Sequence, residues 1–175
     1  MNILEIFINS IKLIVTLDSE LWDIIILSLF VSFTALIIAS ILGFLLGYYF
    51  ALHNFFLKKI ILVLLNSLMG IPPVVVGLIV YFIFASGGPL GVLQLLYTPS
   101  AMIVAQTIII FPIVVSLSHE IFSKNWNEFK DQIRSLNIPF LGSAKLLFNH
   151  SYFLLITTLL SAFGRAISEV GAVMI

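Results

Sequence analysis

The sequence predicts an all-α membrane protein with about four transmembrane helices. Of its 175 residues, 61% are hydrophobic and only 9% are charged, whereas soluble domains carry roughly 25% charged residues. The apolar runs supply the approximately 20 residues that a helix needs to cross a hydrocarbon core. The net charge is zero, which argues against a nucleic-acid partner. Because cysteine is absent, disulfides and Cys-based metal sites are excluded.

The N-terminal segment, residues 1–20, predicts an amphipathic helix. No basic stretch precedes its apolar residues, so it does not resemble a cleavable signal peptide. We expect this helix to lie along the membrane surface or to pack against a span. Its polar residues recur every three or four positions, as one stripe of a helix requires: Asn2, Glu5, Asn9, Lys12 and Thr16.

The rest of the chain, residues 21–175, predicts one transmembrane domain. Its apolar segments predict spans at 21–50, 60–85, 100–118 and 151–175. The three histidines lie at the predicted span ends, far apart in the sequence, so we expect interfacial histidines and no metal site. No nucleotide-binding fingerprint or catalytic set is apparent, which indicates that the chain itself is not an enzyme.

The placement of cations predicts the orientation of the spans. The connection between the first two spans carries Lys58 and Lys59, and the connection between the last two carries Lys124, Lys130, Arg134 and Lys145. The connection between them, residues 86–99, has no charged residue. Basic connections tend to face the cytosol, so we expect the N-terminus outside and membrane lipid around the spans.

The second span contains two adjacent prolines, Pro72 and Pro73, between Gly70 and Gly77. Each proline removes a backbone donor, and the freed carbonyls must find partners in neighbouring helices or in water. One interpretation is a packing kink with close helix approach at the glycines. The interpretation we favour is a helix break that lines a translocation route.

The connection 119–150 is the only long polar stretch, and it predicts a short amphipathic helix. Apolar residues recur at helical spacing in it: Trp126, Phe129, Ile133 and Leu136. Asn137 suits the left-handed end of a helix, and Pro139 prevents continuation, so we expect a turn and then a second helical segment near 143–148. The connection either covers the span ends as a hairpin or docks a cytosolic partner.

The last predicted span carries Arg165 and Glu169, one helical turn apart, with Ser168 between them. Ionisable residues inside a span usually face protein or water rather than lipid. The pair is either a structural ion pair between helices or a polar element beside a pathway.

Three segments together resemble the membrane-spanning subunit of a type I ATP-binding-cassette (ABC) importer, most closely a tungstate-type permease. They are residues 68–78 (LMGIPPVVVGL), 98–107 (TPSAMIVAQT) and 164–175 (GRAISEVGAVMI). The Pro-Pro-Val-Val-Val-Gly element is shared with molybdate permeases, whereas the last string is the more specific signal. Family members continue into an outer loop and one further helix, so the resemblance implies that the last family helix is missing here.

The resemblance implies a homodimer in a bacterial or archaeal plasma membrane. It further implies a cytosolic ATP-binding subunit, which binds the ATP, so no cofactor is expected in this chain, and an extracytoplasmic substrate-binding protein. It assigns coupling to the ATPase to Phe129, Asp131, Ile133, Arg134, Leu136 and Asn137. It assigns the translocation pathway to Pro72, Pro73, Arg165, Ser168 and Glu169.

The cytosolic loop departs from the family motif, which reads Glu-Ala-Ala, three residues, then Gly. The matching positions here are Asp131, Gln132, Ile133 and Asn137. The coupling assignment therefore depends on position and amphipathicity more than on identity. Two other functions remain open: an importer of molybdate or sulfate, and a membrane scaffold that transports nothing.

Overall fold

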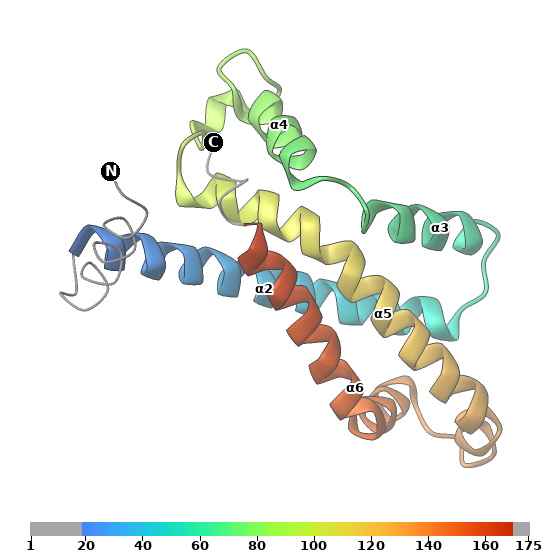
Figure 1. Ribbon diagram of the computed structural model, residues 1–175. Helices are drawn as coiled ribbons and strands as arrows, with labels where there is room; N and C mark the ends of the chain where they lie inside the picture. Colours follow the sequence, from blue (N-terminus) through green and yellow to red (C-terminus); the bar gives the residue numbers. More distant parts are fainter. Residues whose placement is uncertain (1–18, 170–175) are drawn as a thin grey trace.

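The computed structural model describes residues 19–169, and within them every long element is a helix (Figure 1). The predicted amphipathic helix at residues 1–20 lies almost entirely outside the described residues. The elements in chain order are α2 (Ser19–Leu52), α3 (Lys58–Leu68), α4 (Pro73–Phe84), the 3₁₀ turn η1 (Gly91–Leu93), α5 (Pro99–Ser135) and α6 (Phe140–Ser168).

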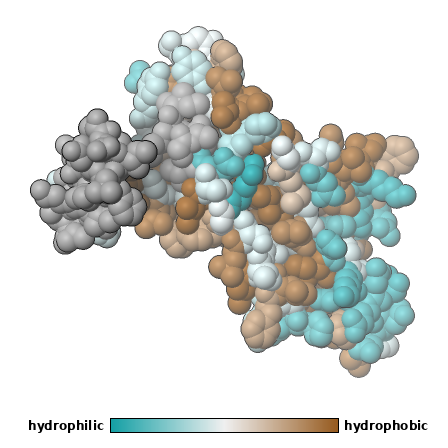
Figure 2. All heavy atoms as spheres, in the orientation of Figure 1, coloured by the Kyte–Doolittle hydropathy of each residue, from teal (hydrophilic) through white to brown (hydrophobic). Residues whose placement is uncertain are grey.

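The prediction of an all-α membrane protein is confirmed. Three helices are long and apolar enough to cross a membrane: Leu21–Leu52 within α2, and α5 and α6. The pair α3 and α4 passes the same test together, but the two helices meet at an angle of 105°. Figure 2 shows hydrophilic residues gathered at the end of the molecule where α5 turns into α6, the end that the charge pattern assigns to the cytosol.

The helix of the third span continues beyond its predicted end at 118, and the helix of the fourth begins before its predicted start at 151. α5 continues from Pro99 to Ser135 without interruption, so the amphipathic helix expected within 119–150 is the second half of this span helix. Residues 119–135 contain neither glycine nor proline, so nothing breaks the helix where it leaves the apolar segment. Similarly, the segment expected near 143–148 belongs to α6, which begins at Phe140.

A stripe of small residues on α2 allows close contact with α5. Ala35, Ala39, Gly43, Gly47 and Ala51 recur every four residues along one face. A Cβ atom added to Gly43 would lie 2.7 Å from Val114 Cγ1, and one added to Gly47 would overlap Ser118 Oγ. The Ser118 hydroxyl also donates a hydrogen bond of 3.3 Å to the Gly43 carbonyl. Small residues and hydroxyls stabilise helix pairs in a membrane, because an apolar side chain is solvated by lipid about as well as by another helix.

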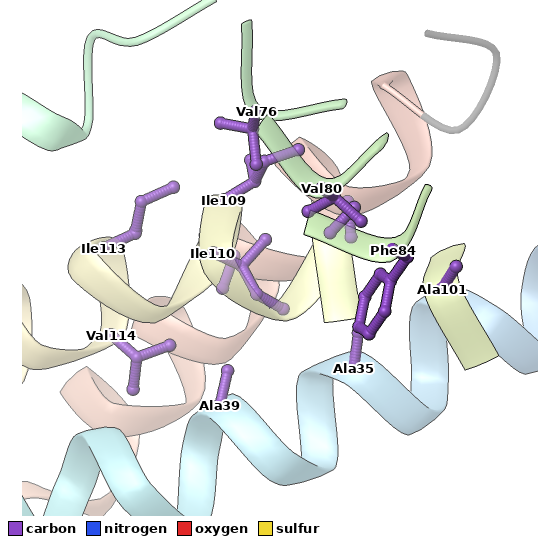
Figure 3. Close-up of a cluster of buried hydrophobic side chains, with 13 residues drawn as sticks. Ala35, Ala39, Val76, Val80, Phe84, Ala101, Ile109, Ile110, Ile113 and Val114 are labelled. Atoms are coloured by element: carbon purple, nitrogen blue, oxygen red, sulfur yellow. The ribbon is translucent and has the colours of Figure 1, made fainter. Parts of the chain in front are cut away.

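The main apolar core lies around α5, between α2 and α4. Figure 3 shows Val76 of α4 beside Ile109 of α5, whereas Phe84, one turn beyond Val80 in α4, is directed toward Ala35 of α2. All five side chains are buried. Ala35 and Ala39 of α2 and Ala162 and Ala166 of α6 complete this cluster. The core therefore positions the start of α4 beside the C-terminal part of α6.

Candidate functional site

The break between α3 and α4 is the first part of the candidate site. Because Pro72 and Pro73 have no N–H, the carbonyls of Leu68 and Met69 lose their usual helical donors. The Leu68 carbonyl instead accepts from the Ile71 N–H at 3.2 Å, and the Pro72 carbonyl accepts from the Val75 N–H at 2.9 Å. In a continuous helix the Val75 N–H would donate to the Ile71 carbonyl. Here it donates to the Pro72 carbonyl, so the Ile71 carbonyl can accept a hydrogen bond from another donor. The predicted helix break is confirmed.

Arg165 supplies this donor from α6. Its Nη2 donates a hydrogen bond of 3.5 Å to the Ile71 carbonyl, while its Nη1 lies 3.2 Å from Glu169 Oε1. The two side chains are 33% and 21% exposed, so the ion pair is shielded but still reached by solvent. The structure thus brings the predicted residues Arg165 and Glu169 to the break formed by Pro72 and Pro73.

Ser168, also predicted at this site, does not bond to the Arg165 side chain. Its exposed hydroxyl donates to the Arg165 carbonyl at 2.9 Å, within its own helix.

Gln106 of α5 is a member of this site that sequence reasoning did not single out. It is fully buried, and its Nε2 donates a hydrogen bond of 3.2 Å to the Ala166 carbonyl of α6. Among the described residues, its Oε1 has no hydrogen-bond partner, nor does Arg165 Nε. Its sequence signal was a single amide side chain within an apolar segment. Such a side chain indicates a contact with another polar group, because buried polar groups in a membrane normally have hydrogen-bond partners. We call Ile71, Gln106, Arg165 and Glu169 the polar junction.

The polar junction can hold an anion weakly. A guanidinium presents several donors in a plane, which suits carboxylates and oxyanions. Glu169 already offsets its charge, so an entering anion must compete with a carboxylate for the same donors. The other partner of Arg165 is a main-chain carbonyl at a helix break, where the backbone can move more readily than within a helix.

A sharp turn between α5 and α6 forms the elbow, which we define as residues 129–143. Asn137 has a left-handed backbone with φ of 49°. Its N–H bonds the Arg134 carbonyl at 3.1 Å, and the Ile138 N–H bonds the Ile133 carbonyl at 3.0 Å. These two bonds satisfy the last carbonyls of α5 in a Schellman motif. The expectation that Asn137 ends a helix in the left-handed region is confirmed.

The predicted coupling residues all lie in the elbow, but they do not form one exposed face. Leu136 is 72% exposed, whereas Ile133 is only 4% exposed. Phe129 is partly buried, with its ring 4.8 Å from that of His150. Part of the apolar stripe therefore packs against other residues of this chain and is not open to a partner. The residues open to a partner are Asp131, Arg134, Leu136 and Asn137, and their coupling role stays a prediction.

The start of α6 is fixed to the rest of the bundle by Tyr48 of α2. The Tyr48 hydroxyl lies 2.8 Å from Ser143 Oγ and donates to the Phe140 carbonyl at 3.2 Å. Its ring packs edge-on against Phe122 of α5 at 5.7 Å. From Phe140, α6 continues as one helix to Arg165, a length of about 37 Å along the helix at about 1.5 Å per residue. One continuous helix thus connects the elbow to the polar junction.

Comparison with known proteins identifies the family. The chain is 39% identical over 173 residues to the tungstate uptake system permease protein TupB of Peptoclostridium acidaminophilum, covering 99% of this chain and 76% of the relative. The chain belongs to the tungstate-type permeases of ABC importers. A second TupB, from Campylobacter jejuni, is 37% identical over 70% of this chain and 51% of the relative.

A third relative has a broader name. A probable anion ABC transporter permease protein of Haloferax volcanii is 36% identical over 85% of this chain and 64% of its own length. No family model matches the chain. These relatives are permease subunits, and together with the apolar helices they indicate a multi-pass protein of the plasma membrane.

Proposed function

We propose that this chain forms the translocation pathway of an ATP-driven tungstate importer, with the polar junction on that pathway. The observation that carries the proposal is the contact of Arg165 with the Ile71 carbonyl, which places a cation at a helix break inside an apolar bundle. The TupB relatives, at 39% and 37% identity, support tungstate as the anion. Competition from Glu169 favours weak binding, which a pathway requires because release must follow entry.

The proposed transporter contains two copies of this chain and two kinds of partner. A cytosolic subunit binds and hydrolyses ATP, and docks on the exposed residues of the elbow. An extracytoplasmic binding protein delivers the anion on the side where the N-terminus lies. The basic connections, which carry Lys58 and Lys59 in one case and Arg134 in the other, support this orientation.

Coupling in this proposal is mechanical. ATP binding and hydrolysis in the partner move the elbow, and α6 transmits the movement because it is continuous from Phe140 to Ser168. A shift of α6 changes the distance between the Arg165 guanidinium and the Ile71 carbonyl. The break then has two arrangements, one with this contact formed and one with it broken, and they correspond to outward and inward access. The anion at the polar junction and the ATPase at the elbow both shift the equilibrium between them.

The second candidate function is import of molybdate or sulfate. It is favoured by the general name of the Haloferax volcanii relative, a probable anion permease. The polar junction has no feature that distinguishes one divalent oxyanion from another. A scaffold without transport is the remaining alternative, and a cation at a helix break argues against it.

Cellular tungsten and molybdenum, measured by elemental mass spectrometry after gene deletion and restoration, test the proposal. Loss of tungsten alone on deletion, with recovery on restoration, is the expected result. Loss of molybdenum instead would assign the substrate to the second candidate. If neither metal changes, sulfate uptake is measured next, and normal uptake of all three anions would overturn the proposal in favour of a scaffold.

A further inference from the structure

A second polar region lies between α3 and α5, away from the residues described so far. It is a groove of about 420 Å³ whose lining includes Asn66 of α3 and Ser116, His119, Glu120 and Ser123 of α5. The four α5 residues occupy positions i, i+3, i+4 and i+7 and so lie on one face of the helix. We call this region the α3–α5 groove.

The α3–α5 groove lies next to the helix break. Met69, the residue that follows α3 directly, lines this groove and also lines a separate, smaller cavity of about 50 Å³ whose lining includes Ile71. Along α5, Ser116 lies ten residues beyond Gln106, a separation of about 15 Å. Along α5, the groove therefore begins about 15 Å beyond the polar junction and extends toward the end that carries the elbow.

Ser116 indicates that the groove receives a ligand. It is 8% exposed and lines the groove, yet its Oγ has no partner among the described residues. Several helical hydroxyls, those of Ser40, Ser67 and Thr107, bond the carbonyl four residues earlier. Within the part of the chain that the structure describes, the Ser32 hydroxyl is likewise buried without a partner, but Ser32 does not line the groove. A buried hydroxyl without a partner costs free energy, and a ligand in the groove would remove that cost.

The groups around Ser116 are mostly neutral hydrogen-bond donors. Asn66 has an amide NH₂, and the Ser123 hydroxyl lies 3.1 Å from His119 Nε2, so that this pair supplies a further donor. Lys58, at the start of α3, is close enough to interact electrostatically with His119. Glu120 is exposed at the groove and opposes tight retention of an anion.

We infer that the α3–α5 groove is a weak binding site for a tetrahedral oxyanion, held by Asn66, Ser116 and the His119–Ser123 pair. In this inference, which depends on the proposed function, the transported anion passes from the polar junction into this groove on its way to the cytosol. The phosphate of a lipid headgroup has the same chemistry, and it could enter because α3 has no residue that is buried in the described structure.

A cysteine reporter can test the inference, because the chain has no cysteine of its own. Leu62→Cys places a thiol in the groove and keeps every polar group. Val63→Cys is the matched control, because Val63 is 64% exposed and does not line the groove. The full chain is purified in dodecyl maltoside, a detergent without phosphate, and the rate of reaction with a maleimide is measured with and without tungstate.

Tungstate should slow labelling of Leu62→Cys but not of Val63→Cys. At roughly nine times the dissociation constant the slowing should be about tenfold, because only the unoccupied groove reacts. Adding Ser116→Ala or Asn66→Leu to the reporter should abolish the protection. Gel filtration of each variant shows whether it is folded, and the second variant replaces the first if one aggregates.

Two results would overturn the inference. Protection by phosphatidylglycerol added to the detergent micelles, with none from tungstate, would assign the groove to a lipid phosphate. No protection by either would remove the oxyanion site altogether. Tungsten uptake by cells with the unmodified chain separates the two proposals: normal uptake together with an unprotected reporter contradicts only the groove, whereas absent uptake contradicts the proposed function itself.

Discussion

Arg165 connects two parts of the molecule that are far apart in the sequence. It pairs with Glu169 in its own helix and bonds the main chain of Ile71, which lies 94 residues earlier. Spacing alone predicted the pair with Glu169, because residues four apart share a helix face. The contact with Ile71 was not predictable, because a carbonyl acceptor is present at every residue and leaves no pattern in the side chains.

Gly47 lies in close contact with α5, so added volume there should be harmful. A Cβ atom there would overlap Ser118 Oγ, so Gly47→Ala should destabilise the fold by about 1–3 kcal/mol through overpacking. Gly164→Ala is the matched control, because nothing lies within 4 Å of its added Cβ. The control should stabilise α6 by up to about 1 kcal/mol, since alanine favours helix. Thermal unfolding in detergent measures both, and equal melting temperatures for the two variants would contradict the packing of α2 on α5.

At the scale of elements, the helix break follows directly from the two prolines. Replacing both Pro72 and Pro73 with alanine should allow α3 and α4 to form one straight helix and free the Arg165 guanidinium from Ile71. Spin labels on Val63→Cys and Phe82→Cys, both exposed positions, report the change. In a straight helix they would lie about 28 Å apart, and the 105° bend should make the measured distance shorter in the chain with both prolines. The same distance with and without the prolines would show that they do not cause the break.

The elbow depends on the backbone of Asn137. Asn137→Val should destabilise the turn by about 1–2 kcal/mol, because a β-branched residue is strained at φ of 49°. Asn137→Gly is the matched variant and should be at least as stable as the original, since glycine adopts this conformation freely. Unfolding temperatures in detergent compare the three. A valine variant as stable as the glycine variant would mean that the turn has another conformation.

Element types were more predictable than their lengths. The prolines and Asn137 have strong local conformational preferences, so the break and the turn were found from sequence. The continuation of α5 through residues 119–135 was missed because polarity there was interpreted as a connection, although polar residues remain helical where a span helix extends into water. The stripe from Ala35 to Ala51 was also missed, since small residues contribute little to a hydropathy pattern.

At the scale of the whole molecule, the orientation in the membrane can be tested with single cysteines. Ser86 and Ser135 are both exposed, at opposite ends of the bundle. With the N-terminus outside, Ser86→Cys should react with an impermeant maleimide in intact cells, and Ser135→Cys should react only after the membrane is opened. The reverse pattern would invert the proposed orientation and place the elbow outside, beyond reach of an ATPase.

The direct test of the polar junction as part of a tungstate pathway is cellular tungsten in cells that carry Arg165→Ala. Lys145→Ala is the control, because Lys145 is an exposed cation on the same helix and lies outside the junction. Western blots of membranes check that both variants are present in equal amounts, and co-purification checks that the ATPase still binds. We expect tungsten to fall to the level of the gene deletion in Arg165→Ala and to stay normal in Lys145→Ala. Normal tungsten in both would reduce Arg165 to a structural residue and contradict a pathway through the junction.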